Sequence, residues 1–352
     1  MSRTGLVLVT SDFILDRWLD QVAETLRERG FEVLRGPKQV PPAKTRFAAE
    51  DLPRYFAQAD IVITTTRSII SSEALAAAHR LRGIVYPTIG TESVDLTSAN
   101  ELGIAVAHGP TPENFNSMAE STVLLMLALL YDLHGTERVL RENLPRPEVI
   151  RARMMMRKRV GLVGFGRIAR GIADRLSGWG VEILVFDPYL DASNLPPGVR
   201  RVDFESLLRE SDIVSVHTTL TQETRHMINE SALSLMKPTG YLVNTARGGM
   251  VDEAALYKAL REKRIAGAAL DAFEHEPLPA DHPLRTLDNV ILTPHMVGHT
   301  QEVFDAIPGT LLENIDRMLV GEKPLYFRNP EVHAAWQKRL QRLPRHGSPQ
   351  AA

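Results

Sequence analysis

Residues 160–169 read Val-Gly-Leu-Val-Gly-Phe-Gly-Arg-Ile-Ala, and this stretch decides the fold of the chain. Its first four residues predict a strand, and apolar residues at helical spacing (168, 172, 173 and 176) predict a helix after it. Gly164 allows a tight turn, Gly166 lets the backbone approach a pyrophosphate, and Ala169 lets the helix pack closely on the strand. A helix that begins there points its N-terminus at the phosphates. The G-x-G-x-x-G/A pattern predicts a dinucleotide site, although glycine-rich turns are common and the pattern alone is a weak signal.

A carboxylate at the expected distance strengthens this prediction. Asp187 ends the next apolar run, residues 183–186, about 20 residues after the glycines, where an acidic side chain accepts both ribose hydroxyls. The alternative is that Asp187 and Pro188 only begin a turn. A carboxylate at this position repels a 2′-phosphate, and residues 188–190 contain no arginine, so the sequence favours NAD over NADP.

The composition of the 352 residues excludes several classes of protein. Its 41 basic and 43 acidic residues nearly balance, which gives no electrostatic case for a nucleic acid or an anionic membrane as partner. The absence of cysteine excludes disulfides, cysteine nucleophiles and thiolate metal sites. The longest apolar stretch, residues 123–130, is too short for a membrane span, and the N-terminus does not resemble a signal peptide. We therefore expect a cytoplasmic protein.

Short apolar runs alternate with amphipathic segments in two series, which predicts βαβ units around parallel sheets. The first series predicts a helix at 14–29 and strands at 6–9, 32–34, 61–64, 83–86 and 104–107. Residues 114–131 predict a long helix that is apolar on most sides and therefore buried, in the core or against a second subunit. A polar link with little periodicity, residues 134–158, precedes the second series. That series predicts strands at 160–163, 183–186, 213–217, 241–244, 266–270 and 290–293.

Three polar residues follow predicted strands of the second series. Arg247 follows residues 241–244, Glu276 follows 266–270, and His295 follows 290–293. The carboxyl ends of parallel strands form the edge of the sheet where ligands bind. Hydride transfer at C2 of a hydroxy acid needs a base such as histidine, a carboxylate that orients the base, and an arginine that grips the substrate carboxylate. A lone histidine at a strand end is more often structural than catalytic. His295 is nevertheless a candidate base, because the carboxylate and the arginine occur together with it.

The chain resembles the D-isomer specific 2-hydroxyacid dehydrogenase family over about residues 61–330, most strongly over 160–300. The resemblance is carried by motifs that agree in order and spacing, at residues 90–95, 116–120, 164–169, 217–221, 244–249, 271–277 and 293–298. Three positions depart from the family pattern. Ala169 replaces the usual third glycine, Thr88 stands where glycine is common, and Thr219 stands where proline is common.

The resemblance implies a role for each candidate residue. Arg247 would bind the substrate, Glu276 would orient His295, His295 would be the acid/base, and the N–H groups of Ile89 and Gly90 would take the substrate carboxylate. Arg167 and Ile168 would lie along the pyrophosphate, and Asp271 would bond the nicotinamide carboxamide. The full set of cofactor contacts that it implies is Gly164, Gly166, Arg167, Ile168, Asp187, Thr218, Thr245, Ala246, Asp271 and Gly298.

The resemblance also implies an architecture. We expect an α/β protein of two Rossmann-like, doubly wound parallel-sheet domains, with the active site in the cleft between them and a homodimer formed through the 114–131 helix. We assign residues 1–109 and 300–342 to the substrate domain, residues 110–299 to the NAD-binding domain, and residues 343–352 to a disordered tail rich in Pro, Gly, Ser, Gln and Ala.

We therefore predict an NAD-dependent oxidoreductase that transfers a hydride between nicotinamide and C2 of a small D-2-hydroxy acid or 2-keto acid. Residues 84–88 lack the basic side chains that a phosphorylated substrate would want, which disfavours 3-phosphoglycerate. NAD-dependent formate dehydrogenase, a relative in fold, carries glutamine where Glu276 stands. An NAD(H)-sensing protein of the corepressor type is compatible with all three polar residues and stays open as the alternative. Arg67 is either a solvated loop residue or a substrate contact.

Overall fold

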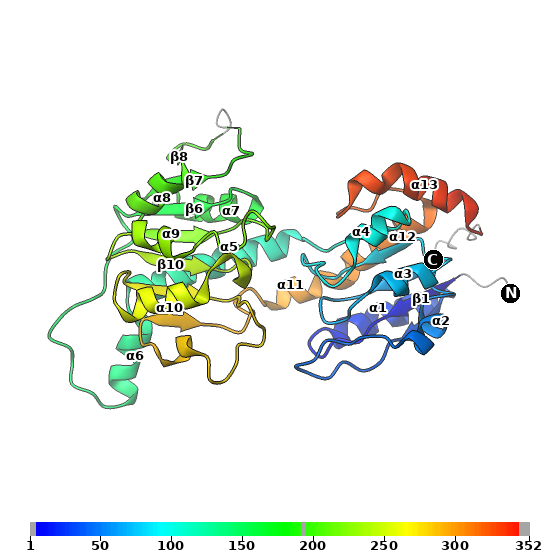
Figure 1. Cartoon of the computed structure of the whole chain (residues 1–352), viewed down its shortest axis with the longest axis horizontal. Helices are drawn as coiled ribbons and strands as arrows, with labels where there is room; N and C mark the ends of the chain where they lie inside the picture. Colours follow the sequence, from blue (N-terminus) through cyan, green and yellow to red (C-terminus); the bar gives the residue numbers. More distant parts are fainter. Residues whose placement is uncertain (1–4, 192–194, 345–352) are drawn as a thin grey trace. The chain divides into compact units, whose positions relative to one another are not determined.

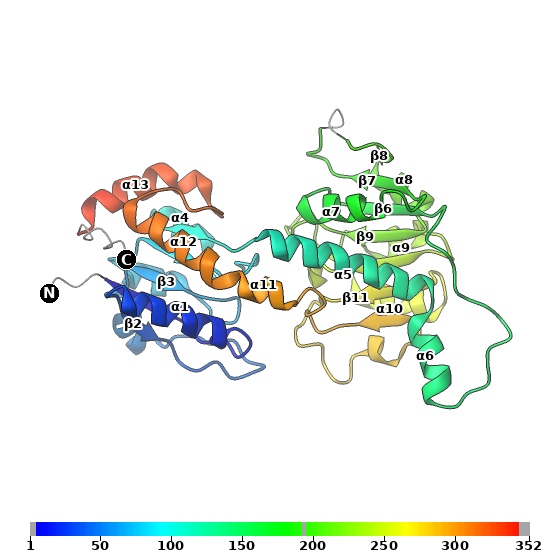
Figure 2. The same ribbon diagram turned by 180° about the vertical axis from the view of Figure 1, so that it is seen from behind.

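The computed structural model describes residues 5–191 and 195–344, which form two compact units (Figures 1 and 2). One unit contains Met1–Glu113 and Thr300–Ala352, and the other is the uninterrupted stretch Asn114–His299. Of the predicted tail at 343–352, only Leu343 and Pro344 are described, and the rest lies outside the described residues.

The first unit is built around a parallel sheet of five strands in the order β2-β1-β3-β4-β5. These strands are β1 (Leu6–Val9), β2 (Glu32–Arg35), β3 (Ile61–Ile63), β4 (Gly83–Val85) and β5 (Ala105–Ala107). Every residue of β1, β3, β4 and β5 is buried. Continuous apolar runs of this kind are typical of parallel strands that helices cover on both faces.

Both ends of the chain contribute helices to this unit. On one face, α1 (Asp16–Glu28) packs beside α12 (Ile307–Val320), as Figure 2 shows, and α13 (His333–Arg342) buries Trp336 in the same core. The Trp18 and Phe304 rings stack at 4.6 Å, where α11 (Gln301–Asp305) meets α1. The other face carries α2 (Leu52–Tyr55), α3 (Ser72–Ala77) and α4 (Leu96–Glu101).

The second unit has a parallel sheet of seven strands in the order β12-β11-β10-β9-β6-β7-β8. The strands are β6 (Arg159–Val163), β7 (Glu182–Phe186), β8 (Val199–Arg201), β9 (Ile213–Val216), β10 (Tyr241–Asn244), β11 (Gly267–Leu270) and β12 (Val290–Leu292). The chain moves outward from β6 to β8 and then returns to β9 on the other side of β6. This reversal between β6 and β9 is the switch point at which doubly wound sheets bind ligands.

Helices cover both faces of this second sheet. Figure 1 shows α8 (Phe204–Glu210), α9 (Glu230–Leu235) and α10 (Glu253–Arg261) on one face, and Figure 2 shows α5 (Pro112–Leu130) and α7 (Arg167–Leu176) on the other. The prediction of an α/β protein with two doubly wound parallel sheets is confirmed.

Two elements differ from the sequence prediction. β8 was not predicted, because its Val-Arg-Arg sequence contains no apolar run and it pairs only with β7 at the edge of the sheet. The link expected to be irregular at 134–158 begins with α6 (Leu133–Arg141), a helix with no buried residue. The Glu137–Arg141 ion pair, at 2.6 Å and four residues apart, supports this exposed helix.

Across the described ranges, no helix combines the length and the apolarity that a membrane span requires.

Candidate active site

The strands of the second unit end in a common row, and the predicted site residues follow that row. Parallel pairing aligns Phe186, Val163, Val216, Asn244, Leu270 and Leu292 across the sheet. The next residues along the chain are Asp187, Gly164, His217, Thr245, Asp271 and Thr293. The sheet therefore brings the ends of six strands to one edge, and five of these six residues carry polar side chains.

The loop after β6 has the backbone that a dinucleotide requires. Gly164 has a φ of +90°, and a Cβ there would lie 2.9 Å from the carbonyl oxygen of His217 and 3.0 Å from the nitrogen of Thr218. Both the conformation and the close approach favour glycine. Gly166 precedes α7, and a Cβ on it would meet no atom within 4 Å. The helix N-terminus is therefore open on this side, as an approaching pyrophosphate needs.

Asp187 lies beside this loop. Its carboxylate accepts hydrogen bonds from the backbone N–H groups of Phe165 and Tyr189, both at 3.0 Å. A carboxylate has about four acceptor sites, so capacity remains for ribose hydroxyls. Together with the open backbone at Gly166, this donor and acceptor set fits NAD.

The side chains of Arg167 and Ile168 are engaged elsewhere. The Arg167 guanidinium lies 4.9 Å from the centre of the Phe115 ring on α5, and Ile168 packs against the core between α7 and the sheet. Contact of these two residues with a pyrophosphate stays a prediction.

His217 is held as a neutral ring at the end of β9. Its Nε2 lies 2.8 Å from the Ser215 hydroxyl, and its backbone N–H donates to the carbonyl of Val163 at 2.7 Å. Removal of the ring from water lowers the pKa of His217 to about 3. This group cannot serve as a base near neutral pH. Thr218, the next residue, borders Gly164.

The turn after β10 carries Arg247. Buried Asn244 shapes this turn, because its side chain accepts from the Ala246 N–H at 3.1 Å and donates to the Arg247 carbonyl at 2.9 Å. Thr245 contacts the Thr122 hydroxyl on α5 at 3.1 Å. Arg247 stays partly exposed, and its guanidinium donates to the Ala246 carbonyl at 2.8 Å.

His295 and Glu276 form a hydrogen-bonded pair. His295 Nδ1 lies 2.9 Å from Oε1 and 3.0 Å from Oε2 of Glu276, and the two side chains remain 41% and 39% exposed. Since Nδ1 faces the carboxylate, Nε2 is the ring nitrogen that can exchange a proton with a substrate. His295 has a φ of +56°, an uncommon conformation for a residue other than glycine.

The surroundings of Glu276 keep it ionised. Partial burial acts to raise the pKa of this carboxyl, but the hydrogen bond and charge of His295, the N–H of Phe273 and the charge of Arg247 outweigh it and hold the pKa below its usual value. The Phe273 N–H donates to Oε1 at 3.0 Å. The structure thus brings Arg247, Glu276 and His295 together in the second unit.

Asp271 organises the loop that carries His295. This residue is 2% exposed, and its Oδ1 accepts from the Thr293 hydroxyl at 2.7 Å and from the N–H groups of Met296 and Val297 at 2.9 and 3.2 Å. Sequence reasoning missed this role. The role follows from the register of β11 with β12, which places Asp271 beside Thr293 and which the sequence alone does not give.

Gly298 packs against α5. Its carbonyl accepts from the Ser117 hydroxyl at 2.8 Å, and a Cβ on this glycine would overlap the sulfur of Met118. This close packing accounts for glycine at position 298, and its predicted contact with the cofactor stays a prediction.

Ile89 and Gly90 lie in the first unit, in the loop that follows β4. His108 Nδ1 lies 2.9 Å from the Ile89 carbonyl. Within the described residues, the N–H groups of Ile89 and Gly90 donate to no protein acceptor, as a carboxylate-binding loop requires. Their contact with the substrate stays a prediction.

Arg67 is not a solvated loop residue. It pairs at 3.0 Å with Asp12, whose side chain is fully buried, and its guanidinium lies 5.0 Å from the centre of the Phe13 ring. Asp12 also accepts from the N–H groups of Ile14 and Leu15 at the start of α1.

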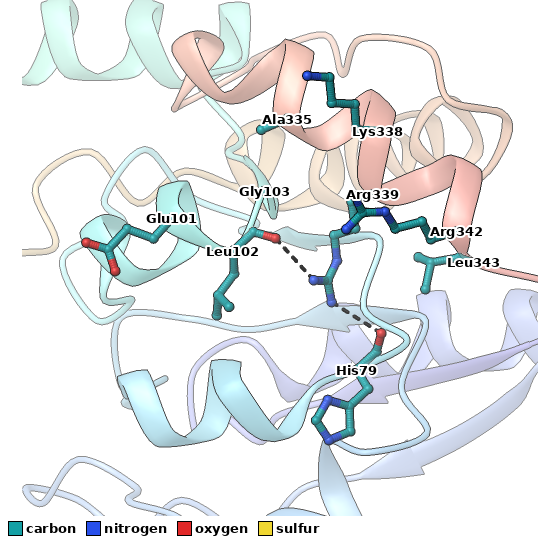
Figure 3. Close-up of a pocket in the computed structure, with 9 residues that line it drawn as sticks. All are labelled: His79, Glu101, Leu102, Gly103, Ala335, Lys338, Arg339, Arg342 and Leu343. Carbon is teal, nitrogen blue, oxygen red and sulfur yellow. Dashed lines mark hydrogen bonds between the residues drawn. The ribbon is translucent and has the colours of Figure 1, made fainter.

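A hollow beside α13 does not qualify as a second site (Figure 3). Arg339 crosses it and donates to the carbonyls of Leu102 at 3.1 Å and His79 at 3.4 Å. Its guanidinium therefore satisfies backbone carbonyls at the ends of neighbouring segments. The charged ends of Lys338 and Glu101 and the ring of His79 point in different directions in Figure 3. Polar groups therefore do not converge there on a ligand.

Comparison with known proteins agrees with the geometry. The family model for the NAD binding domain of D-isomer specific 2-hydroxyacid dehydrogenases matches residues 123–297. Over 306 residues the chain is 38% identical to the glyoxylate reductase of Thermofilum pendens, covering 85% of this chain and 88% of that protein. The chain belongs to this family. It is an NAD-dependent D-2-hydroxyacid dehydrogenase, and NAD(H) is its cofactor, as the sequence predicts.

Other similar proteins show the range of this dehydrogenase family. The D-3-phosphoglycerate dehydrogenase of Methanocaldococcus jannaschii is 35% identical over 307 residues, which cover 86% of this chain but only 57% of that longer protein. The crystal structure of the TT0316 protein from Thermus thermophilus is similar with a TM-score of 0.78 and 33% identity, covering 92% of this chain and 99% of that one.

Proposed function

We propose that this dehydrogenase interconverts a small 2-keto acid and the corresponding D-2-hydroxy acid, with His295 as the acid/base. The observation that carries the proposal is the pairing of His295 Nδ1 with both oxygens of Glu276, at 2.9 and 3.0 Å, beside the charge of Arg247. A base, its orienting carboxylate and a cation for an acid substrate are the parts that this reaction needs.

Each of these side chains has one task. NAD(H), when bound, supplies or accepts the hydride at C2. During reduction the carbonyl oxygen of the substrate becomes a hydroxyl, and His295 Nε2 donates the proton. Ionised Glu276 stabilises the protonated ring before that transfer. Arg247 binds the substrate carboxylate by charge-assisted hydrogen bonds. Gly166, with the N-terminus of α7, and Asp187 hold the dinucleotide.

The loop after β4 supplies two further substrate contacts in this proposal. Ile89 and Gly90 offer two backbone N–H groups to the substrate carboxylate. Residues 84–88 contain no basic side chain, which favours a small substrate without a phosphate. The name of the glyoxylate reductase relative agrees with a small 2-keto acid.

Replacement of His295 tests the assignment of the base. We expect His295→Ala to lower kcat by about 10²- to 10⁴-fold, the usual contribution of general acid–base catalysis, with NADH affinity nearly unchanged. NADH consumption with glyoxylate, hydroxypyruvate, pyruvate and longer keto acids measures turnover, and fluorescence titration measures NADH binding. His275→Ala is the control, because His275 is an exposed histidine of the loop that carries Glu276.

Turnover that survives His295→Ala would refute the assignment of the base. A wild-type protein that binds NADH tightly but reduces none of these acids would instead favour an NAD(H)-sensing protein.

We also propose a homodimer, formed through α5 and the segment that follows it. Large apolar side chains are exposed at several positions along this part of the chain, including Leu124 (56%), Tyr131 (50%), Leu133 (56%), Leu140 (85%), Val149 (71%), Ile150 (87%) and Met154 (63%). Exposed apolar surface is typical of a protein interface. We expect Leu140→Asp combined with Ile150→Asp to yield a monomer in sedimentation experiments, and a dimer that persists would place the interface elsewhere.

A further inference from the structure

Beyond the pairing of β10 with β11, the segments that carry Arg247 and Glu276 also meet at a peptide group. This peptide, between Phe273 and Glu274, lies against Gly248 so closely that a Cβ on Gly248 would overlap its carbonyl group. Gly248 directly follows Arg247, and Glu274 stands two residues before Glu276. This peptide is therefore a direct packing contact between the two catalytic segments.

Glu253 holds the same peptide by its N–H. Oε1 of Glu253 accepts from the backbone N–H of Glu274 at 2.8 Å, and Oε2 lies 3.3 Å from Nε2 of His282. Glu253 is the first residue of α10 and is only 8% exposed. The helix does not need this carboxylate as a cap, because Asp252 already accepts from the Ala255 N–H at 3.0 Å.

A buried carboxylate at this position is unfavourable by itself. Burial raises the pKa of Glu253, and the charge of Glu274 acts in the same direction, while the N–H of Glu274 and the charges of His282 and His275 oppose both. Charged groups are seldom buried unless a specific interaction retains them. Two interactions use this carboxylate: Oε1 accepts from the Glu274 N–H, and Oε2 faces His282.

The side chain of Glu274 anchors the peptide on its other side. Its Oε1 lies 3.1 Å from Nε2 of His226, and its Oε2 lies 3.7 Å from Nη2 of Arg225. Backbone and side chain of Glu274 are thus tied to two different segments.

We propose that Glu253 is a positioning residue for catalysis. It holds the Phe273–Glu274 peptide against Gly248 and thereby fixes the position of Glu276 relative to Arg247. Glu253 touches neither the pair of His295 and Glu276 nor Arg247 through any hydrogen bond of the described residues, so it acts through this peptide. This inference rests on the proposed roles of Arg247, Glu276 and His295.

Two conservative substitutions of Glu253 separate the effect of its side-chain length from the effect of its charge. Glu253→Gln keeps an acceptor oxygen at the same distance and loses the charge, whereas Glu253→Asp keeps the charge and withdraws the oxygen by one methylene. We expect Glu253→Gln to retain nearly full activity. We expect Glu253→Asp and Glu253→Ala to lose about 10²-fold in kcat/KM, the usual effect of a displacement of about 1 Å in a catalytic constellation. Both kcat and the KM for the keto acid should change, because Glu276 and Arg247 both lose their placement.

A double-mutant cycle shows whether the effect passes through Glu276. In a Glu276→Gln background, the loss of kcat caused by Glu253→Asp should largely disappear, because interacting residues are not additive. Glu262→Ala is the matched control, since Glu262 is an exposed carboxylate just past the other end of α10. NADH affinity and thermal stability are measured for every variant.

Several results would overturn the proposal. Glu253→Asp with the kinetics of Glu262→Ala, Glu253→Gln as impaired as Glu253→Asp, or full additivity with Glu276→Gln would each do so. If Glu253→Ala does not fold, the kinetics of Glu253→Gln and Glu253→Asp still test the proposal. Failure of the proposed function is recognised separately, by an active His295→Ala enzyme.

Discussion

Glu276→Gln removes the charge beside His295 while keeping the shape of the side chain. In the structure, both carboxylate oxygens of Glu276 lie within hydrogen-bond distance of His295 Nδ1, at 2.9 and 3.0 Å. Glutamine offers one oxygen and no charge, so the protonated ring loses its ionic partner. The variant therefore isolates the contribution of the carboxylate to proton transfer.

The expected loss follows from the strength and exposure of this bond. A hydrogen bond to a charged group contributes about 1.5–3 kcal/mol. The two side chains are 41% and 39% exposed, and water competes with such a pair, so we take the lower part of that range, about 1.5–2 kcal/mol. This corresponds to a fall in kcat of about 10- to 30-fold. A glutamine amide that donates to Nδ1 would select the wrong tautomer and deepen the loss.

Steady-state kinetics of keto acid reduction, followed by NADH absorbance, measure this ratio. The pKa of Glu276 lies below its usual value of 4.5, so the carboxylate is ionised at higher pH and the ratio of wild-type to variant kcat stays constant there. As the pH falls through the lowered pKa, wild-type Glu276 becomes protonated and the ratio shrinks. A variant with the kcat of the wild type at neutral pH would refute the reasoning.

Two further predictions concern Arg247 and His217. Arg247→Lys should raise the KM for the keto acid about tenfold, equivalent to about 1.4 kcal/mol, because an ammonium cannot pair with both carboxylate oxygens, and an unchanged KM would remove Arg247 from the carboxylate site. His217→Gln should flatten the pH dependence of stability. The pKa of His217 is lowered from 6.5 to about 3, so between these values the unfolded chain binds a proton that the folded chain does not, and wild-type stability falls with decreasing pH. One proton gives a slope of at most about 1.4 kcal/mol per pH unit, and the partial exposure of His217 reduces it. Denaturant unfolding of both proteins measures the slope, and parallel pH profiles would contradict the prediction.

Much of the fold could be predicted because its strands are buried on both faces. Runs such as Leu6–Val9 and Tyr241–Asn244 form strands within the bounds that their apolar pattern indicates. β8 was not predicted because an edge strand needs no apolar run, and α6 was not predicted because it is a short helix without buried residues at the start of a polar link with two prolines. Both elements depend on neighbours or on surface charges that a hydrophobic pattern does not record.

The site residues that could be predicted are those that come after the end of a strand. Arg247, Glu276 and His295 come after β10, β11 and β12, and parallel pairing places those ends at one edge. The anchoring roles of Asp271 and Glu253 were not predictable from residue type. They depend on the direction in which backbone N–H groups of other loops point, as with Met296 for Asp271 and Glu274 for Glu253.

The division of the chain has a consequence for the order of events during synthesis. The stretch Asn114–His299 is uninterrupted, so it can fold as soon as it has left the ribosome. The earlier stretch up to Glu113 completes its core later, because Leu311, Ile315 and Met318 of α12 belong to that core and are translated after residue 299. Until then, the face of its sheet that carries α1 lacks the cover of α12 and α13, and exposed apolar surface of this kind makes a nascent chain prone to aggregation.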